Sequence, residues 1–207
     1  MLDNKSHHPK LIDDYIVPEN VGGIMVDIGV AIGAFTKEYA DKFDMIYGFE
    51  PTYTNFVRAI YNTRKLDNVM LYPMGFSDKE MDILTMKSTG QNLYSYTSDV
   101  TPEIERFKYD HVKPASEETQ TTFTINLESI LKLCGGHINY LKMDCEGAEM
   151  CLIDNDEVKN IDYIGMEVHE FIYGNPKLNN LKSFLSNYFE IKVNENIWFC
   201  QNKSLSL

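Results

Sequence analysis

The stretch that decides the fold is Val26-Asp27-Ile28-Gly29-Val30-Ala31-Ile32-Gly33, which is followed by Phe49-Glu50-Pro51. An apolar run ends in a glycine turn, a helix-like segment comes next, and a second apolar run ends in an acid. Glycine has no Cβ, so Gly29 and Gly33 let the backbone turn sharply and approach a ligand closely. Glu50, at the end of the second run, is placed to accept hydrogen bonds from a ribose diol. The pattern predicts the first half of a nucleotide-binding α/β unit.

The same glycine turn also indicates which ligand it suits. A dinucleotide fingerprint reads G-x-G-x-x-G and packs a pyrophosphate onto a helix N-terminus. Here Ala31 stands at the middle glycine position, and Asp27 adds a negative charge close to where a pyrophosphate would lie. A carboxylate there is better matched to a cation, such as the amino group of S-adenosylmethionine. The turn therefore favours a methyl donor over NAD, with a plain strand-ending turn as the alternative.

Length and composition indicate one globular domain. The chain has 207 residues, of which 43% are hydrophobic and 12% are aromatic, enough to bury a substantial core. No run approaches about 18 successive apolar residues, which argues against a membrane span. Residues Met1 to Lys10 are polar and lack the apolar core of a secretory signal. We expect a single cytoplasmic domain over residues 1–207, with 1–20 as an N-terminal extension.

The net charge and the spacing of the cysteines limit the classes of partner that the protein is expected to bind. The formal net charge is −12 at pH 7, with no basic stripe in the sequence, whereas nucleic-acid binding depends on clustered Lys and Arg. The cysteines form no CxxC pair and no zinc-like spacing, so reduced, mostly buried thiols are expected at Cys134, Cys145, Cys151 and Cys200. The sequence predicts a small-molecule or saccharide partner rather than a nucleic acid.

Apolar runs alternate with helix-like segments along most of the chain. Strands are expected at Ile24–Ile28, Met45–Phe49, Val69–Tyr72, Ile138–Met143 and Tyr163–Val168, with a closing pair at Phe189–Val193 and Ile197–Gln201. Helices are expected at Ala34–Lys42, Thr54–Lys65, Glu146–Ile153 and Leu178–Ser186. Such alternation implies a mostly parallel sheet with right-handed crossovers. The closing pair, joined at Asn194-Glu195-Asn196, adds an antiparallel edge.

The region from Ser77 to Ile130 breaks this rhythm. Two short strands are expected there, at Met81–Met86 and Thr121–Ile125, and between them Lys87–Gln120 is polar and rich in Tyr and Thr. An insertion of this length is usually functional or disordered. We expect it to form a lid on the side of a second substrate, residues 87–120. Its aromatic residues either stack on a flat ligand or sugar ring or pin the insertion to the core: Tyr94, Tyr96, Phe107 and Tyr109.

Several motifs occur in the order seen in the FkbM family of methyltransferases, which this chain resembles from about Val21 to Asn202. They are Val26-Asp27-Ile28-Gly29, Phe49-Glu50-Pro51 with Asn55-Phe56, Thr124-Ile125-Asn126-Leu127-Glu128-Ser129, Tyr140-Leu141-Lys142-Met143-Asp144-Cys145-Glu146-Gly147-Ala148-Glu149, and Glu167-Val168-His169. The resemblance implies a class I S-adenosylmethionine-dependent fold, Rossmann-like, with seven strands and helices on both faces. It also implies O-methylation of a sugar or natural-product hydroxyl.

The chain departs from the family pattern at the glycine turn. The family usually reads Asp-x-Gly-Ala-Asn-x-Gly, and this chain has Val30-Ala31 where Ala-Asn is expected. Losing the Asn amide removes a polar contact near the donor, worth on the order of 1 kcal/mol of binding. A conservative change also puts Glu128 where the family has Asp.

The expected site residues follow from the fold and the chemistry. Open α/β sheets bind ligands at the carboxyl ends of their strands, and methyl transfer needs positioning, worth about 7–11 kcal/mol, and a base, worth roughly 10²–10⁴ in rate. The expected donor-binding residues are Asp27, Gly29, Val30, Ala31, Gly33, Glu50, Pro51, Phe76 and Asp144. The candidate catalytic residues are Lys142, Asp144, Glu146, Glu167 and His169.

Lys142 is unusual because central parallel strands are normally apolar on both faces. An unpaired buried ammonium is very costly, so we expect an ion pair with Asp144, or with Glu167 across the ladder. No metal is assigned, although Asp144, Glu146, Glu167 and His169 are also types that suit a hard cation. Two rival functions remain open: an S-adenosylmethionine-binding protein that has lost catalysis, and a nucleic-acid methyltransferase of the same fold.

Overall fold

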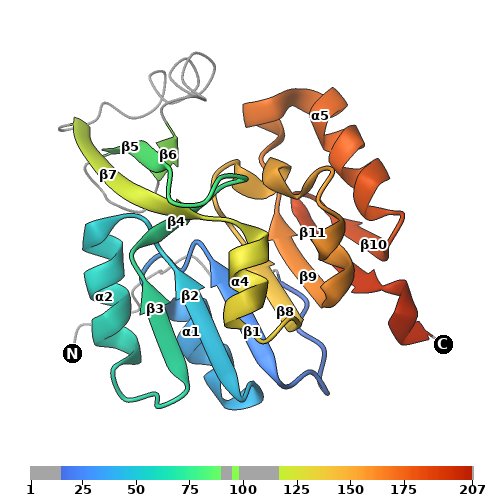
Figure 1. Ribbon diagram of the computed structural model, residues 1–207, viewed down its shortest axis with the longest axis horizontal. Helices are drawn as coiled ribbons and strands as arrows, with labels where there is room; N and C mark the ends of the chain where they lie inside the picture. Colours follow the sequence, from blue (N-terminus) through green and yellow to red (C-terminus); the bar gives the residue numbers. More distant parts are fainter. Residues whose placement is uncertain (1–14, 90–94, 98–116, 207) are drawn as a thin grey trace, which may run out of the picture.

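A seven-stranded sheet forms the centre of the protein (Figure 1), in a computed structural model that describes residues 15–89, 95–97 and 117–206. The strands lie in the order β10-β11-β9-β8-β1-β2-β3. Their bounds are β1 Ile24–Ile28, β2 Met45–Phe49, β3 Val69–Tyr72, β8 Ile138–Met143, β9 Ile161–Glu167, β10 Phe189–Asn194 and β11 Ile197–Asn202. The five strands from β9 to the β3 edge are parallel, and β11 pairs antiparallel with both β9 and β10. The expected mostly parallel sheet with a terminal hairpin is confirmed.

Helices cover both faces of this sheet, as expected. The α-helices are α1 Ala34–Tyr39, α2 Tyr53–Thr63, α4 Leu127–Leu133 and α5 Glu170–Leu185, and the 3-10 helices are η1 Ala40–Lys42, η3 Ala148–Leu152, η4 Asp156–Asn160 and η5 Lys203–Ser206. Successive strand residues point to opposite faces, so β1 contributes to two cores. Val26 and Ile28 pack with α4 and α5, whereas Met25 packs with Phe35 of α1.

The chain joins this core from Tyr15 onward. Tyr15 is 8% exposed and lies edge-on to Phe35, with ring centroids 5.4 Å apart. Val21 is also buried on the same face of the sheet. The described end of the expected N-terminal extension is therefore part of the α1-side core.

A second, four-stranded sheet accounts for much of the region that breaks the strand–helix rhythm. Its order is β4-β7-β5-β6, with β4 Met74–Phe76, β5 Ile83–Thr89, β6 Ser95–Thr97 and β7 Glu117–Ile125. Of these four strands, only β5 and β7 were expected from the sequence. Residues 90–94 and 98–116 lie outside the described part of the chain, with Tyr94, Phe107 and Tyr109 among them, so the lid remains a prediction.

The expected helix over Glu146–Ile153 is wrong. Glu146 and Gly147 have positive φ angles, 49° and 120°, and two such residues in succession cannot begin a right-handed helix. The chain turns there and forms only the short 3-10 helix η3. The last helix begins earlier than expected, at Glu170, and is kinked at Gly174, which has non-helical backbone angles (φ 73°, ψ 159°).

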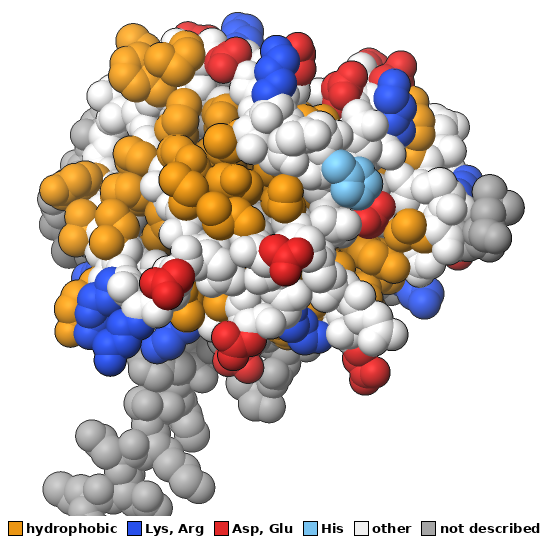
Figure 2. Space-filling model, turned by 60° about the horizontal axis from the view of Figure 1, so that its bottom comes forward, with side chains coloured by type: hydrophobic (Ala, Val, Ile, Leu, Met, Phe, Trp, Pro, Cys, Tyr) orange, Lys and Arg blue, Asp and Glu red, His pale blue; other side chains and the backbone are white. Residues whose placement is uncertain are grey.

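The distribution of basic side chains and the state of the cysteines agree with what the sequence predicted. On the face drawn in Figure 2, Lys and Arg side chains lie in small separate groups rather than in a continuous stripe. None of the helices in the described ranges is long and apolar enough to cross a membrane. All four cysteines are free thiols, as expected, and Cys134 and Cys200 are buried.

The backbone just after β1 passes close to the backbone just after β8, and this approach predicts a large cost for Gly29→Ala. A Cβ on Gly29 would lie 1.8 Å from the backbone oxygen of Asp144. Gly135 is the matched control, because its φ of 72° resembles the 81° of Gly29 and a Cβ there would meet nothing within 4 Å. Gly135→Ala should cost only the left-handed penalty of about 1–2 kcal/mol. Gly29→Ala should cost about 1–3 kcal/mol more from overpacking, measured by urea denaturation. Equal losses would contradict the assignment.

Candidate active site

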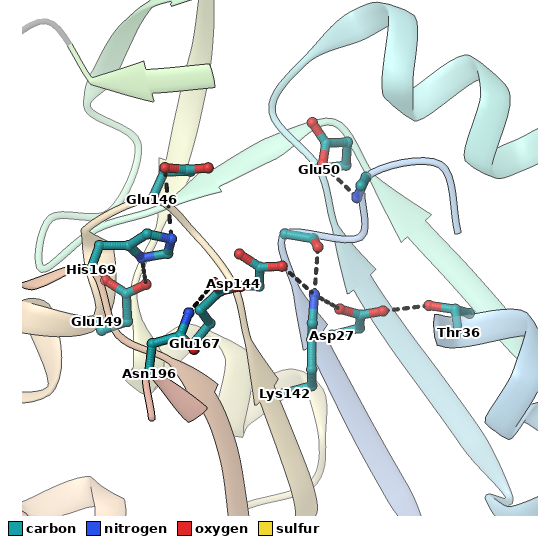
Figure 3. Close-up of polar contacts among 12 residues, drawn as sticks. Asp27, Thr36, Glu50, Lys142, Asp144, Glu146, Glu149, Glu167, His169 and Asn196 are labelled. Atoms are coloured by element: carbon teal, nitrogen blue, oxygen red, sulfur yellow. Dashed lines mark hydrogen bonds and ion pairs between the residues drawn. The ribbon is translucent and has the colours of Figure 1, made fainter. Parts of the chain in front are cut away.

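The functional side chains gather where the strands β1, β2, β8 and β9 end (Figure 3). Parallel strands bring their carboxyl ends to the same edge of a sheet, which is where open α/β folds bind ligands. Two groups of residues lie there. The donor-side group surrounds the glycine turn after β1 and Glu50 after β2. The carboxylate cluster, defined as Asp144, Glu146, Glu149 and Glu167, surrounds His169 after β8 and β9.

Lys142 joins the two groups. Its Nζ donates to the backbone oxygen of Gly29 at 2.7 Å and lies 3.2 Å from Asp27 Oδ1 and 3.9 Å from Asp144 Oδ2. Burial alone would lower the pKa of Lys142, but the charges of Asp27 and Asp144 outweigh it and raise the pKa. The ammonium is therefore charged although its side chain is only 5% exposed.

The expected ion pair of Lys142 with Asp144 is present, and the strand register adds a closer partner. Asp27 lies directly opposite Lys142 on β1, whereas the residue opposite on β9 is Gly165. Glu167 is two positions further along β9, and it is not among the ion-pair partners of Lys142. Asp144, the other expected partner, is a second and more distant one.

Asp27 has no exposed surface. Its Oδ2 accepts a hydrogen bond from Thr36 Oγ1 at 2.6 Å, and its Oδ1 faces Lys142. The sequence hypothesis placed this carboxylate beside the amino group of the donor. In the structure it is occupied within the protein, where it holds Lys142 against the glycine turn.

The glycine turn alternates residues in the left-handed region: Gly29, Ala31 and Gly33 have φ angles of 81°, 50° and 81°. Ala31 is the position where the family has Asn. Asn adopts positive φ several-fold more readily than most residues, while a Cβ-bearing residue pays about 1–2 kcal/mol there. The structure thus adds a backbone cost to this departure, and the lost amide contact stays a prediction.

Glu50 is held in place by this turn. Its Oε2 accepts from the Ala31 N–H and its Oε1 from the Thr52 N–H, both at 2.8 Å. Burial raises the pKa of Glu50 to about 7, and the two backbone hydrogen bonds lower it only in part. The Thr52 side chain also donates to this carboxylate, which has about four lone-pair sites in all and so keeps capacity for a ligand hydroxyl. Of the other expected donor residues, Val30 and Phe76 are buried and Pro51 is partly buried.

His169 lies among the carboxylates. Its Nδ1 is 3.2 Å from Glu149 Oε1 and its Nε2 is 3.8 Å from Glu146 Oε2. Burial lowers the pKa of His169, but the hydrogen bond and charge of Glu149, with Glu146 and Asp144, raise it to about 9. A residue of the hairpin between β10 and β11 also contacts Glu167, because Asn196 Nδ2 donates a hydrogen bond to Glu167 Oε1. Burial, with the charge of Asp144, raises the pKa of Glu167.

Three side chains that organise the site were not singled out from the sequence. Thr36 binds Asp27, Glu149 binds His169, and Asn196 binds Glu167. Glu149 belongs to the motif that runs from Tyr140 to Glu149, the most specific of the chain. Its place in that motif could have identified it as a site residue. Asn196 lies in the hairpin turn, and its carbonyl also accepts from the Val168 N–H at 2.8 Å.

The seven-stranded sheet with its antiparallel hairpin, together with acids at the ends of β2 and β8, defines a class I S-adenosylmethionine-dependent methyltransferase. The chain matches the methyltransferase FkbM domain over residues 27–190 and belongs to that family. No curated protein matches it significantly.

Solved structures with a similar arrangement are distant in sequence. M. capricolum TrmK, in complex with S-adenosylhomocysteine, is 11% identical with a TM-score of 0.41, covering 89% of this chain. This chain spans 63% of TrmK, less than two thirds of its length. An rRNA methylase from Streptococcus thermophilus is 9% identical with a TM-score of 0.45, covering 88% of each chain. Precorrin-6y C5,15-methyltransferase from Geobacter metallireducens is 12% identical with a TM-score of 0.43, covering 89% of this chain and 79% of its own.

S-adenosylmethionine is the cofactor, and the residues present fit it. Glu50 presents two acceptor oxygens at the end of β2, as a ribose diol requires. The carboxylate of Asp144 is 29% exposed beside the glycine turn, which suits the ammonium and sulfonium charges of this donor.

The buried ion pair predicts a large effect of Lys142→Met. Removing the ammonium leaves the wholly buried Asp27 carboxylate without its cation, which typically costs about 3–5 kcal/mol. Denaturant unfolding measures the loss. Lys132→Met is the matched control, because Lys132 pairs with Glu128 in an exposed contact, and little change is expected there. A loss for Lys142→Met no larger than that of the control would contradict the structural role.

The pKa of Glu50 predicts that donor binding strengthens as pH rises from 6 to 8. Ionised Glu50 accepts hydrogen bonds at both oxygens, whereas the protonated form gives up part of that capacity. A pKa of about 7 makes the group mostly protonated at pH 6 and mostly ionised at pH 8, so affinity should rise up to roughly tenfold.

Calorimetric titration with S-adenosylmethionine measures this dependence, and Glu50→Gln is the control. The amino group of the donor itself also titrates near pH 8, so the difference between the two proteins is the informative quantity. Glu50→Gln should bind more weakly at pH 8 and lack the Glu50-dependent rise. The same pH dependence in both proteins would remove the ribose assignment.

Proposed function

We propose that this methyltransferase transfers the methyl group of S-adenosylmethionine to a hydroxyl of a saccharide or natural-product small molecule. The observation that carries the proposal is the carboxylate cluster around His169, which lies directly beside the donor-side group through Lys142 and Asp144. A hydroxyl must lose its proton as the new C–O bond forms, and this cluster supplies proton acceptors at that place.

The donor-side residues position the cofactor. Glu50 binds the ribose hydroxyls, and the backbone from Gly29 to Gly33 lies against the methionine part, where left-handed residues bring the chain close. When bound, the cofactor supplies an activated methyl group whose transfer leaves the bonding electron pair on sulfur. Lys142 fixes the Gly29 carbonyl and Asp144 together, so the donor and acceptor sides keep a constant separation, which in-line displacement requires.

Glu146 is the proposed base. Its side chain is 16% exposed, so it is reachable from solvent while it remains beside His169. Its φ of 49° is costly for a residue with a Cβ, and such strain tends to persist at functional sites. His169, oriented by Glu149, faces Glu146 and stabilises the carboxylate.

The charge of the molecule supports a small acceptor over a nucleic acid. A phosphate backbone would approach a chain of net charge −12 and a site with several carboxylates. Figure 2 presents Lys and Arg side chains only in small groups on the face drawn. Nucleic-acid binding draws most of its affinity from clustered cations.

The test is transfer from methyl-labelled donor to a panel of hydroxylated saccharides and natural products, with RNA and DNA as further acceptors. Label in an alkali-stable ether of a small acceptor is expected. Glu146→Gln should lower kcat by about 10²–10⁴ and leave the donor Kd unchanged, while Glu190→Gln, an exposed carboxylate on β10, should match the parent.

Three results would overturn the proposal. Label in nucleic acid would establish the rival methyltransferase class. Donor binding with no turnover on any acceptor of the panel would favour a binding protein without catalysis. A Glu146→Gln variant with the parental kcat would remove the base assignment.

A further inference from the structure

We propose that Asp144, Glu167 and His169 form a binding site for a divalent cation on the acceptor side of the sheet. Each offers one ligand atom, and these three atoms lie within 4.8 Å of one another. In an octahedral shell with bonds of about 2.1 Å, neighbouring ligand atoms are about 3 Å apart and opposite ones about 4.2 Å. Small side-chain rotations therefore bring the three atoms onto one ion.

The candidate ligands are held from the side that would face away from the ion. Glu149 binds Nδ1 of His169, and the ring atom that would ligate is Nε2, which lies 3.8 Å from Glu146 Oε2. Asn196 binds Oε1 of Glu167 and leaves Oε2. Histidines that bind metals almost always donate their other ring N–H to a carboxylate or carbonyl, which fixes the tautomer and the ring orientation. The contact between Glu149 and His169 has that form. Glu149 lies in η3, which is a different element from those on either side of His169.

The excess of acids around the site also favours a cation. The carboxylate cluster holds four acids, and Lys142 lies closer to Asp27 than to any of them. Glu149 is wholly buried, and its Oε2 has no hydrogen-bond partner in the described part of the chain. A buried carboxylate that is incompletely paired is costly, and a doubly charged ion ligated by the neighbouring His169 offsets that cost.

The ligand chemistry favours Mn²⁺ over Mg²⁺. Two carboxylates suit either ion, but Mg²⁺ prefers oxygen ligands throughout, whereas an imidazole nitrogen suits transition metals. Three ligands from the protein leave positions for water or acceptor hydroxyls, and a bound hydroxyl becomes more acidic. The ion site itself does not rest on the proposed O-methylation, because it can be measured without an acceptor.

The first experiment titrates Mn²⁺ into the metal-free full chain and follows the free ion by electron paramagnetic resonance. His7→Gln and His8→Gln are introduced throughout, since a His pair near the N-terminus can bind metals on its own. One saturable site per chain is expected, with at least tenfold weaker binding of Mg²⁺ in competition. Asp144→Asn, Glu167→Gln and Glu149→Gln should each weaken Mn²⁺ binding at least tenfold, and Glu190→Gln should not.

A second experiment uses the chain without changes at the site, so it does not depend on how the variants fold. In protein with ¹⁵N-labelled histidine, substoichiometric Mn²⁺ should broaden the ring signals of His169 and leave those of His137 sharp. His137 is a matched internal control, because its Nε2 also lies beside a carboxylate, 3.1 Å from Asp162, where β8 begins.

Each result decides the proposal. Selective broadening of His169 together with one saturable site supports it. Binding only above about 1 mM, equal loss in Glu190→Gln, or equal broadening of His137 and His169 overturns it. Donor titrations on the unchanged site separate the two proposals: a chain that binds the donor and transfers methyl groups but shows no Mn²⁺ site overturns the ion site and leaves the proposed function standing.

Discussion

The Lys142 ammonium is the point at which the two sides of the site meet. It lies on β8, its nearest carboxylate belongs to β1, and it donates to a carbonyl of the glycine turn. Because its side chain is almost completely buried, these contacts are not weakened by solvent as surface ion pairs are. Thr36 of α1 holds the other oxygen of Asp27, so a helix, two strands and a turn share one hydrogen-bonded network. The glycine turn and Asp144, which are proposed to position the donor, belong to this network.

Backbone strain gathers at the same edge. Within the two short stretches after β1 and β8, five residues have positive φ angles: Gly29, Ala31, Gly33, Glu146 and Gly147. Two of them are not glycine, and the cost of each must be met by the surrounding contacts. Ala31 donates its N–H to Glu50, and Glu146 contacts His169. The strained residues are thus tied to the side chains that the proposed chemistry uses.

The sequence predicted the parallel core well, because its strands are apolar runs between turn residues. Several of them, such as Ile24–Ile28 and Ile138–Met143, begin and end at the predicted residues. The small sheet was predicted only in part: β5 and β7 were expected, whereas β4 and β6 have only three residues each and their pairing depends on distant segments. The prediction of a helix after Asp144 was wrong because Glu146 and Gly147 have positive φ angles, which the sequence motif does not reveal.

The site residues were predicted by type and place, but their partners were not. Lys142 was expected to need a counter-ion, and periodicity could not show that the register sets Asp27 opposite to it. The contact between Asn196 and Glu167 joins residues far apart in the sequence, and no local pattern encodes it. The functional assignments of these residues stay predictions for the experiments above.

The hairpin contact has a consequence for the order in which the protein matures. Chains are made from the N-terminus, so β1, β2, β3, β8 and β9 leave the ribosome before β10 and β11. Until β11 pairs with β9, the backbone edge of β9 is open and Glu167 lacks the amide of Asn196. The donor-side residues are all present by then, since they lie before Cys145. A nascent chain therefore completes its two sides at different times, and the acceptor side waits for the last strand.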